Sequence, residues 1–285
     1  MTDRGTTCPS PDSDSPSETP ESRPTKSRAW LVAVCWILGV GAVAATRFRS
    51  QWDAYRSIHQ WAANNGIPSS LRNYDSLLIY ILAAVIGAAI VSKVLGGRTT
   101  ETLRLSGSQS GIARMLALAT APMILGGIAV GLVRGGLNFD LSAAWPTFSS
   151  GVIRAPIGEE LIFRGLLVAC VARMIGWHGR VFWINAVFAS LAFGSIHVPW
   201  NHDALGSWPA FLVTSAGGVW YVWLLARWRS LWVSIGLHAG MNLGWMLMGA
   251  SGGAGGGGWI ENILRVATIA VATKATLRMS KRVES

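Results

Sequence analysis

Long apolar runs, separated by short polar segments, extend along most of this chain. Eight runs can be distinguished, at residues 29–45, 77–95, 115–133, about 156–175, 183–198, 208–225, 231–249 and 260–277. A helix needs about 17 to 25 residues to cross a bilayer, so the first and fifth runs are at the lower limit. The pattern predicts an all-α protein, a polytopic transmembrane helical bundle of about eight spans.

The composition agrees with a membrane protein. Hydrophobic residues make up 51% of the chain and charged residues 13%, with a mean hydropathy of +0.39, whereas soluble domains carry about 25% charged residues. The formal net charge is +10, which in a soluble protein would suggest nucleic acid. Here the basic residues lie mainly between apolar runs, where they set topology and contact anionic lipid heads. We therefore expect the bilayer as a partner and no nucleic acid.

The N-terminal segment differs from the rest. Residues 1–28 are rich in Ser, Thr, Pro, Asp and Glu and contain too few apolar residues to offset the entropy cost of ordering. We predict a disordered cytoplasmic tail there, followed by a single transmembrane helical domain at residues 29–285. Basic residues flank alternate runs, and the positive-inside rule then places both termini of a multi-pass cell-membrane protein in the cytoplasm.

The connection from residue 46 to 75 does not follow this alternation, because it carries four arginines. It also contains large apolar side chains at helical spacing, namely Trp52, Tyr55, Ile58 and Trp61. This pattern predicts an amphipathic helix lying on the membrane surface.

Two carboxylates and a guanidinium stand near the start of the fourth run. Glu160 and Arg164 are four residues apart, so they share one face of a helix and can form an ion pair. Glu159 lies about 100° further around the axis and must find its partner on another span. Ionisable groups at membrane depth cost roughly 2.5 to 3.5 kcal/mol each on insertion scales, which favours a functional reason for this cluster.

Two later runs each carry a pair one helical turn apart. The fifth has Phe193 and His197, and the seventh has His238 and Asn242. Peptide hydrolysis needs a base that activates water and donors that stabilise the oxyanion. A glutamate with two imidazoles and an amide could supply both.

The seventh run also has glycines at every fourth position, namely Gly236, Gly240 and Gly244. This small-residue spacing predicts that another helix packs closely against the run.

The same side chains could hold a divalent metal such as zinc. Its ligands would then be Glu159, His197 and His238. The chain contains no His-Glu-x-x-His motif, and Asn is an unusual zinc ligand. The sequence assigns no cofactor, and its three cysteines lack any CxxC spacing that would indicate a zinc knuckle.

Taken together, the three motifs resemble the CPBP family of intramembrane proteases. This family includes the CAAX prenyl proteases, the bacterial Abi proteins and bacteriocin-processing or self-immunity relatives. The resemblance covers about residues 145–249 and rests on Glu159-Glu160-xxx-Arg164, Phe193-xxx-His197 and His238-xxx-Asn242. It implies an endopeptidase that acts on a membrane-associated, in some members prenylated, protein or peptide.

The resemblance also implies roles for the site residues. Glu159 matches the general base for the attacking water, and His197 matches the histidine that holds this water. The family is commonly labelled as metalloprotease, but the structural interpretation of its mechanism favours a water activated by glutamate, without obligatory zinc.

The remaining motif residues match supporting roles. Glu160 and Arg164 correspond to the supporting ion pair. His238 and Asn242 correspond to the residues that stabilise the oxyanion.

Two alternatives remain at this point. The chain could be a non-enzymatic polytopic membrane protein, such as an immunity or scaffold factor or a transporter, although no inverted repeat supports a transporter. Alternating spans would place Glu159 at the outer side of the membrane. A fourth span that begins earlier, near Thr147, with a kink at Pro156 would place it deeper.

Overall fold

The computed structural model describes residues 28–67, 74–106, 111–135, 141–198, 204–249 and 258–279. Within these ranges every regular element is helical, which confirms the all-α prediction. The predicted disordered tail, apart from Arg28, lies outside the described residues.

The elements follow in this order: α1 (Ala29–Phe48), η2 (Arg49–Gln51), α2 (Asp53–Asn64), α4 (Asp75–Leu95), α5 (Thr99–Thr102), α6 (Ile112–Val133), α7 (Leu141–Phe148), η3 (Ser149–Arg154), α8 (Ala155–Glu160), η4 (Leu161–Cys170), α9 (Val171–Ile175), α10 (Gly179–Ser195), α11 (Ala204–Trp228), α12 (Leu231–Leu247) and α13 (Trp259–Met279).

Four helical segments in the described ranges have the length and composition to span a membrane. They are Ala29–Gln51, Asp75–Leu95, Ile112–Val133 and Trp208–Trp228. Only 28% to 39% of the residues in their apolar windows are buried inside the protein. Exposing that much apolar surface to water would cost about 25 cal/mol per Å², so lipid is the environment that fits these helices.

The count of eight spans remains a prediction. The helices α10 and α12 correspond to predicted runs, but each has 17 residues. The helix α13 also occupies a predicted run, and it carries Glu261, Arg265 and Lys274. The first run, predicted at residues 29–45 and so at the lower limit for a span, is longer in the structure, because α1 and η2 continue it to Gln51, 23 residues in all.

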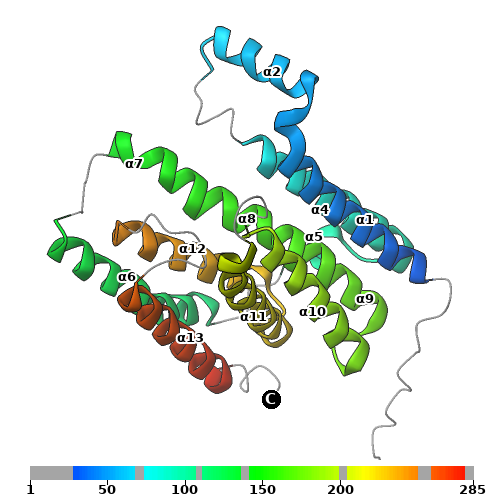
Figure 1. Ribbon diagram of the computed structural model, residues 1–285. Coiled ribbons are helices and arrows are strands. Elements are labelled where there is room, and N and C mark those ends of the chain that lie inside the picture. The colour runs from blue at the N-terminus through cyan, green and yellow to red at the C-terminus, as the bar shows by residue number, and fades with distance from the viewer. Residues whose placement is uncertain are drawn as a thin grey trace, which may run out of the picture.

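A long helical path from α7 to α9 runs through the middle of the bundle (Figure 1). Its five elements follow one another without interruption, and η3 and η4 are wound as π-helix. The helix that carries the fourth run therefore begins before residue 156, at Leu141, which agrees with the alternative of an earlier start near Thr147 and not with a start at about residue 156. Wide π-helical turns adapt a helix to local disruptions, and Pro156 near the start of α8 is such a disruption, since proline donates no hydrogen bond.

This earlier start places the carboxylates in the middle of the path. Glu159 comes 18 residues after Leu141 and 16 residues before Ile175. All ten residues of η4, which follows directly, are buried. On its sides η4 contacts α1, α4, α10 and α12, so the segment that carries the site motif is also the centre of the core.

The helix α12 packs closely on α6, as its glycine spacing predicted. A Cβ atom added to Gly244 would lie 2.5 Å from the carbonyl oxygen of Met123, and one added to Gly127 would lie 2.6 Å from the carbonyl oxygen of Gly244. Real side chains do not approach a backbone this closely, so only glycine fits at both positions.

We expect Gly244→Ala to destabilise the protein by about 1 to 3 kcal/mol, because the added methyl group forces two helices apart. A lower midpoint of thermal unfolding in detergent would show this. Gly41→Ala is the matched control, since nothing lies within 4 Å of a Cβ atom there. Equal midpoints for the Gly244 variant and the unchanged protein would contradict the close packing.

The predicted amphipathic helix is present as α2, which lies apart from the bundle in Figure 1. Trp52, Ile58 and Trp61 are exposed there. His59 on the same helix is partly buried, with its Nε2 atom 3.6 Å from Asp75 Oδ2. The helix itself is confirmed, and its position on a membrane surface remains a prediction.

Candidate active site

The core of the site is a buried ion pair on the central path. Arg164 Nη1 donates to Glu160 Oε1 over 3.1 Å, as their spacing predicted, and the two side chains are 1% and 0% exposed. His238 Nδ1, from α12, lies 2.9 Å from the same oxygen. The Arg164 guanidinium also lies 4.0 Å from the ring centroid of Phe193 and 5.0 Å from that of Tyr221. Glu160 therefore joins the central path to α12.

Glu159 points to a different set of partners. Its Oε2 atom lies 3.8 Å from His197 Nε2 and 3.9 Å from His238 Nε2. Both separations are too long for direct hydrogen bonds. Glu159 Oε2 is buried and has no hydrogen-bond partner among the protein atoms that the structure describes. The structure thus brings the predicted base and both predicted histidines to one point.

The partners of the histidines indicate which ring nitrogens carry protons. His197 Nδ1 lies 2.9 Å from the carbonyl oxygen of Phe193, and because a carbonyl only accepts, this nitrogen donates. His238 Nδ1 faces a Glu160 oxygen and is assigned in the same way. In a neutral ring each Nε2 then presents a lone pair toward Glu159. Three acceptors therefore surround one point, an arrangement that suits a proton donor such as water.

His197 is not part of the helix predicted for it. The helix α10 ends at Ser195, and His197 lies in the turn that follows. Its ring still packs edge-on against Phe193, with centroids 4.7 Å apart. The ring contact that the spacing predicted is thus present without a continuous helix.

Asn242 has a structural contact in addition to its predicted role. Its Nδ2 atom donates to the carbonyl oxygen of Gly151 over 2.7 Å and so ties α12 to η3. It lines the same cavity as His197 and His238. The structure therefore brings all six predicted residues into one region, with Asn242 at its edge.

We tested whether the site fits a metal ion. In the part of the chain that the structure describes, no group of three or more His, Cys, Asp and Glu side chains is arranged to hold one. Glu159, His197 and His238 approach one another, but they do not form such a group. We therefore derive no step through a metal.

The six residues lie within one family match. Residues 141–244 match a family model described as Rce1-like, type II CAAX prenyl endopeptidase. This part of the chain is therefore similar to an Rce1-like endopeptidase domain, and we refer to it below as the Rce1-like domain. It is consistent with a CPBP family protease, which the motifs indicated. A comparison with curated proteins and one with solved structures returned no match. The likeness to Abi proteins stays a prediction.

A large apolar cavity adjoins the Rce1-like site. It has a volume of about 420 Å³ and lies among α10, α11, α12 and α13. His197 and His238 reach it from one side, and Trp220, Tyr221 and Ile269 are among its other lining residues. A ligand in this cavity would contact the same imidazoles that face Glu159.

The sequence patterns missed Tyr221 in the Rce1-like domain. Its ring centroid lies 6.1 Å from that of His238, and its hydroxyl donates to Met241 Sδ over 3.4 Å. It also covers one face of the Arg164 guanidinium. Tyr221 lies on α11, which carries none of the three motifs. No residue spacing within that helix could therefore have indicated its contact with Arg164.

Arg47, which lies outside the Rce1-like domain, also reaches the site. Its Nη1 atom donates to the carbonyl oxygen of Ile196 and its Nη2 atom to that of Val198, each over 3.2 Å. These two carbonyls flank His197. The sequence pattern placed Arg47 in a surface connection, whereas it stands at the end of α1 and holds the turn that carries the histidine.

Proposed function

We propose that the chain is an intramembrane endopeptidase that uses a water activated by Glu159 to hydrolyse a peptide bond in a membrane-associated protein or peptide. The Rce1-like domain gives the protease class at the family level. The observation that carries the mechanism is the buried Glu159 Oε2 atom, which lies 3.8 Å from His197 Nε2 and 3.9 Å from His238 Nε2.

In this mechanism a water lies beside Glu159 and His197 and donates to both, because polar atoms separated by more than 3.5 Å are commonly bridged by water. Glu159 takes one proton as the water oxygen attacks the peptide carbonyl carbon. The C–N bond then breaks, and the proton held by Glu159 passes to the departing amine nitrogen. The products are one new carboxyl group and one new amine.

Donors near the attacked carbonyl stabilise the developing oxyanion. His238 and Asn242 are the candidates. Since His238 Nδ1 already faces Glu160, donation from His238 Nε2 requires the imidazolium form. The Glu160 carboxylate lies at His238 Nδ1, and Arg164 in turn fixes that carboxylate in its buried position. The ion pair is thus a positioning element for His238.

The apolar cavity of about 420 Å³ supplies room for the hydrophobic part of the substrate. Pockets of about 300 to 1,000 Å³ bind small apolar groups with a few polar contacts to orient them. The name of the matched family mentions prenyl substrates. A prenyl chain or a group of apolar side chains beside the scissile bond would fit this space.

We expect His197→Ala to lower cleavage by about 100-fold or more, because the attacking water loses one of its two holding groups. The test compares membrane proteomes of cells that carry the unchanged protein or the variant, at equal protein abundance, and scores fragments that depend on the protein. His178→Ala is the control, since His178 stands at the other end of α10. If fragments persist with His197→Ala, or if no fragment depends on the protein, a non-enzymatic membrane protein is the better conclusion.

A further inference from the structure

The apolar cavity beside the reacting groups contains one cation that the mechanism does not use. Arg265, on α13, lines this cavity of about 420 Å³ together with His197 and His238. Among the described residues that line the cavity, Arg265 is the only one with a permanent charge. It also lies outside residues 141–244, so the family match assigns it no role.

The contacts of Arg265 hold its side chain but do not neutralise it. Its guanidinium carbon lies 4.8 Å from the ring centroid of Trp245. In the part of the chain that the structure describes, Arg265 forms no hydrogen bond and no ion pair. The N–H groups of a guanidinium lie in its plane, so a ring that covers one face leaves these donors and the positive charge for a ligand.

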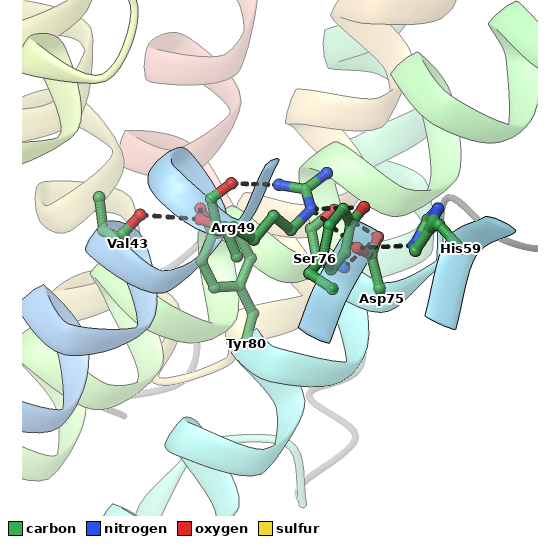
Figure 2. A network of polar contacts seen from close by, with 8 residues as sticks. Val43, Arg49, His59, Asp75, Ser76 and Tyr80 are labelled. Atoms are coloured by element: carbon green, nitrogen blue, oxygen red, sulfur yellow. Dashed lines mark hydrogen bonds and ion pairs between the residues drawn. The ribbon is translucent and has the colours of Figure 1, made fainter. Parts of the chain in front are cut away.

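Other arginines of the bundle have a carboxylate as partner. Arg49 Nε lies 2.7 Å from Asp75 Oδ2, and Figure 2 shows its side chain directed at that group. Arg164 is paired with Glu160 inside the core. These ion pairs compensate the charges within the fold, whereas the charge of Arg265 has no such partner among the described residues.

The acidic residue with the most suitable spacing from Arg265 is paired with another arginine. Glu261 lies four residues earlier on α13, the spacing at which a glutamate and an arginine can pair on one helix face. Its Oε1 atom lies instead 2.8 Å from Nη1 of Arg134, the residue that follows α6. Glu261 therefore ties α13 to the end of α6 and forms no ion pair with Arg265.

The cavity also contains a second polar side chain without a partner. Thr214, on α11, is 8% exposed, and its hydroxyl has no hydrogen-bond partner among the described atoms. A charge in an apolar space is costly unless it is paired, and charged side chains within membrane-spanning bundles commonly mark substrate paths. An anionic ligand in the cavity would offset this cost at Arg265.

The position of the cavity favours the substrate as the source of this anion. Its walls extend from Arg265 to His197 and His238, whose Nε2 atoms face Glu159, and its other lining residues are mainly aromatic or aliphatic. An apolar peptide segment that enters the cavity from the attacked bond would reach Arg265 within a few residues. A lipid headgroup bound to Arg265 would instead take up space beside the two histidines.

We propose that Arg265 binds a carboxylate of the substrate segment that enters the apolar cavity. Guanidinium groups bind carboxylates through charge-assisted, often bidentate hydrogen bonds. The carboxylate is either the α-carboxylate at the end of the chain or an Asp or Glu side chain near the attacked bond. This inference rests on the proposed endopeptidase function, and it narrows the substrate class to apolar segments that carry such a group.

The first test measures kcat/KM for the full-length protein in proteoliposomes. The probes are prenylated-cysteine peptides with three apolar residues after the cysteine, ending in a free carboxylate or in a carboxamide, plus a carboxamide peptide with Asp as its last residue. We expect the free acid to be cleaved about 10- to 100-fold better than the plain amide, as for a hydrogen bond to a charged group. Cleavage of the Asp-containing amide at the rate of the acid would show that a side-chain carboxylate is sufficient, and cleavage at the rate of the plain amide would assign the α-carboxylate. Both results support the site.

The arginine is tested on this preference. Arg265→Gln should bring the acid-to-amide ratio close to one, and Arg265→Lys should retain part of it, because lysine keeps the charge but not the bidentate geometry. Arg278→Gln is the matched control and should keep the full ratio, because Arg278 is exposed on the same helix and does not line the cavity. Equal cleavage of acid and amide by the unchanged protein, or a ratio that survives Arg265→Gln, would overturn the inference while leaving the proposed function standing.

A binding measurement separates the two proposals. The three-residue segment that follows the cysteine is added, as acid or as amide, to the Glu159→Gln variant in detergent, and the midpoint of thermal unfolding is recorded. A higher midpoint with the acid alone, abolished by adding Arg265→Gln, supports the carboxylate site whatever the cleavage assay gives. No shift, or an equal shift with both forms, counts against it. Failure of every peptide to be cleaved, together with a shift by the acid alone, would count against the proposed function only.

The same samples test an anionic lipid as the occupant. Phosphatidylglycerol is added in place of the peptide, with phosphatidylcholine as the neutral control. A midpoint that rises with phosphatidylglycerol alone, that loses this rise in Arg265→Gln and that does not distinguish the acid peptide from the amide would assign the site to a lipid headgroup and overturn the inference. A shift by the acid that persists in the presence of phosphatidylglycerol supports the substrate carboxylate.

Discussion

Glu159→Gln is expected to lower cleavage by about 10³- to 10⁴-fold, the upper part of the range for removal of a general base. The amide keeps the shape of the carboxylate but cannot take a proton from water. Because Glu159 Oε2 has no hydrogen-bond partner among the described protein atoms, the substitution removes no hydrogen bond between that atom and the described protein. The variant should therefore accumulate and unfold like the unchanged protein.

The measurement is kcat/KM on one membrane peptide in proteoliposomes, with the thermal midpoint recorded on the same samples. Glu101→Gln serves as the matched control, since Glu101 lies on α5 and its carboxylate accepts from the backbone nitrogen of Arg98. Cleavage within tenfold of the unchanged protein would refute the role of Glu159 as base. A loss of cleavage that accompanied a lower midpoint would assign Glu159 a structural role instead.

The second large effect concerns stability. Glu160→Leu is expected to destabilise the fold by about 3 to 5 kcal/mol, because it leaves a buried guanidinium without its carboxylate. Arg164 is 1% exposed, so its guanidinium would be left buried without the carboxylate. The substitution also removes the partner of His238 Nδ1, so activity should fall as well.

A second substitution separates these two consequences. Replacing a buried ion pair by apolar side chains of similar volume is often neutral for stability, so Glu160→Leu combined with Arg164→Met should recover most of the lost free energy of unfolding. Activity should not return, because His238 still lacks its carboxylate. Unfolding in detergent by denaturant titration gives the free energies. Asp53→Asn is the control, since Asp53 pairs with Arg56 on the exposed helix α2 and such pairs contribute little. An unchanged midpoint for Glu160→Leu would contradict this account.

Local spacing predicted the contacts between residues that are four positions apart in the sequence. Glu160 and Arg164 pair over four residues, and the ring of Phe193 contacts that of His197. A helical repeat determines which side chains share a face, so such pairs can be read along the chain. The all-helical fold and the lipid environment follow equally from the apolar runs.

Residue spacing was less informative about where the helices begin and end and about how many of them span the membrane. Pro156 left two possibilities open, the start of a span or a kink in a longer helix, and only the structure shows that the helical path begins at Leu141 and continues through the proline. The helix α13 occupies the eighth apolar run, but its charged residues make its composition less typical of a membrane span. A proline in a helix costs free energy locally because it donates no backbone hydrogen bond. Only the packing around the proline shows whether the helix continues.

The residue pattern alone indicated Glu159, His197, His238 and Asn242 as candidate catalytic residues of an apolar helical protein, together with the Glu160–Arg164 ion pair. The pattern did not indicate that Glu159 faces two imidazoles, that Tyr221 covers the Arg164 guanidinium, or that Arg47 holds the turn of His197. These contacts join elements that are far apart in the chain. No periodicity within one helix fixes its rotation and depth against another, because side-chain packing over the whole core sets both.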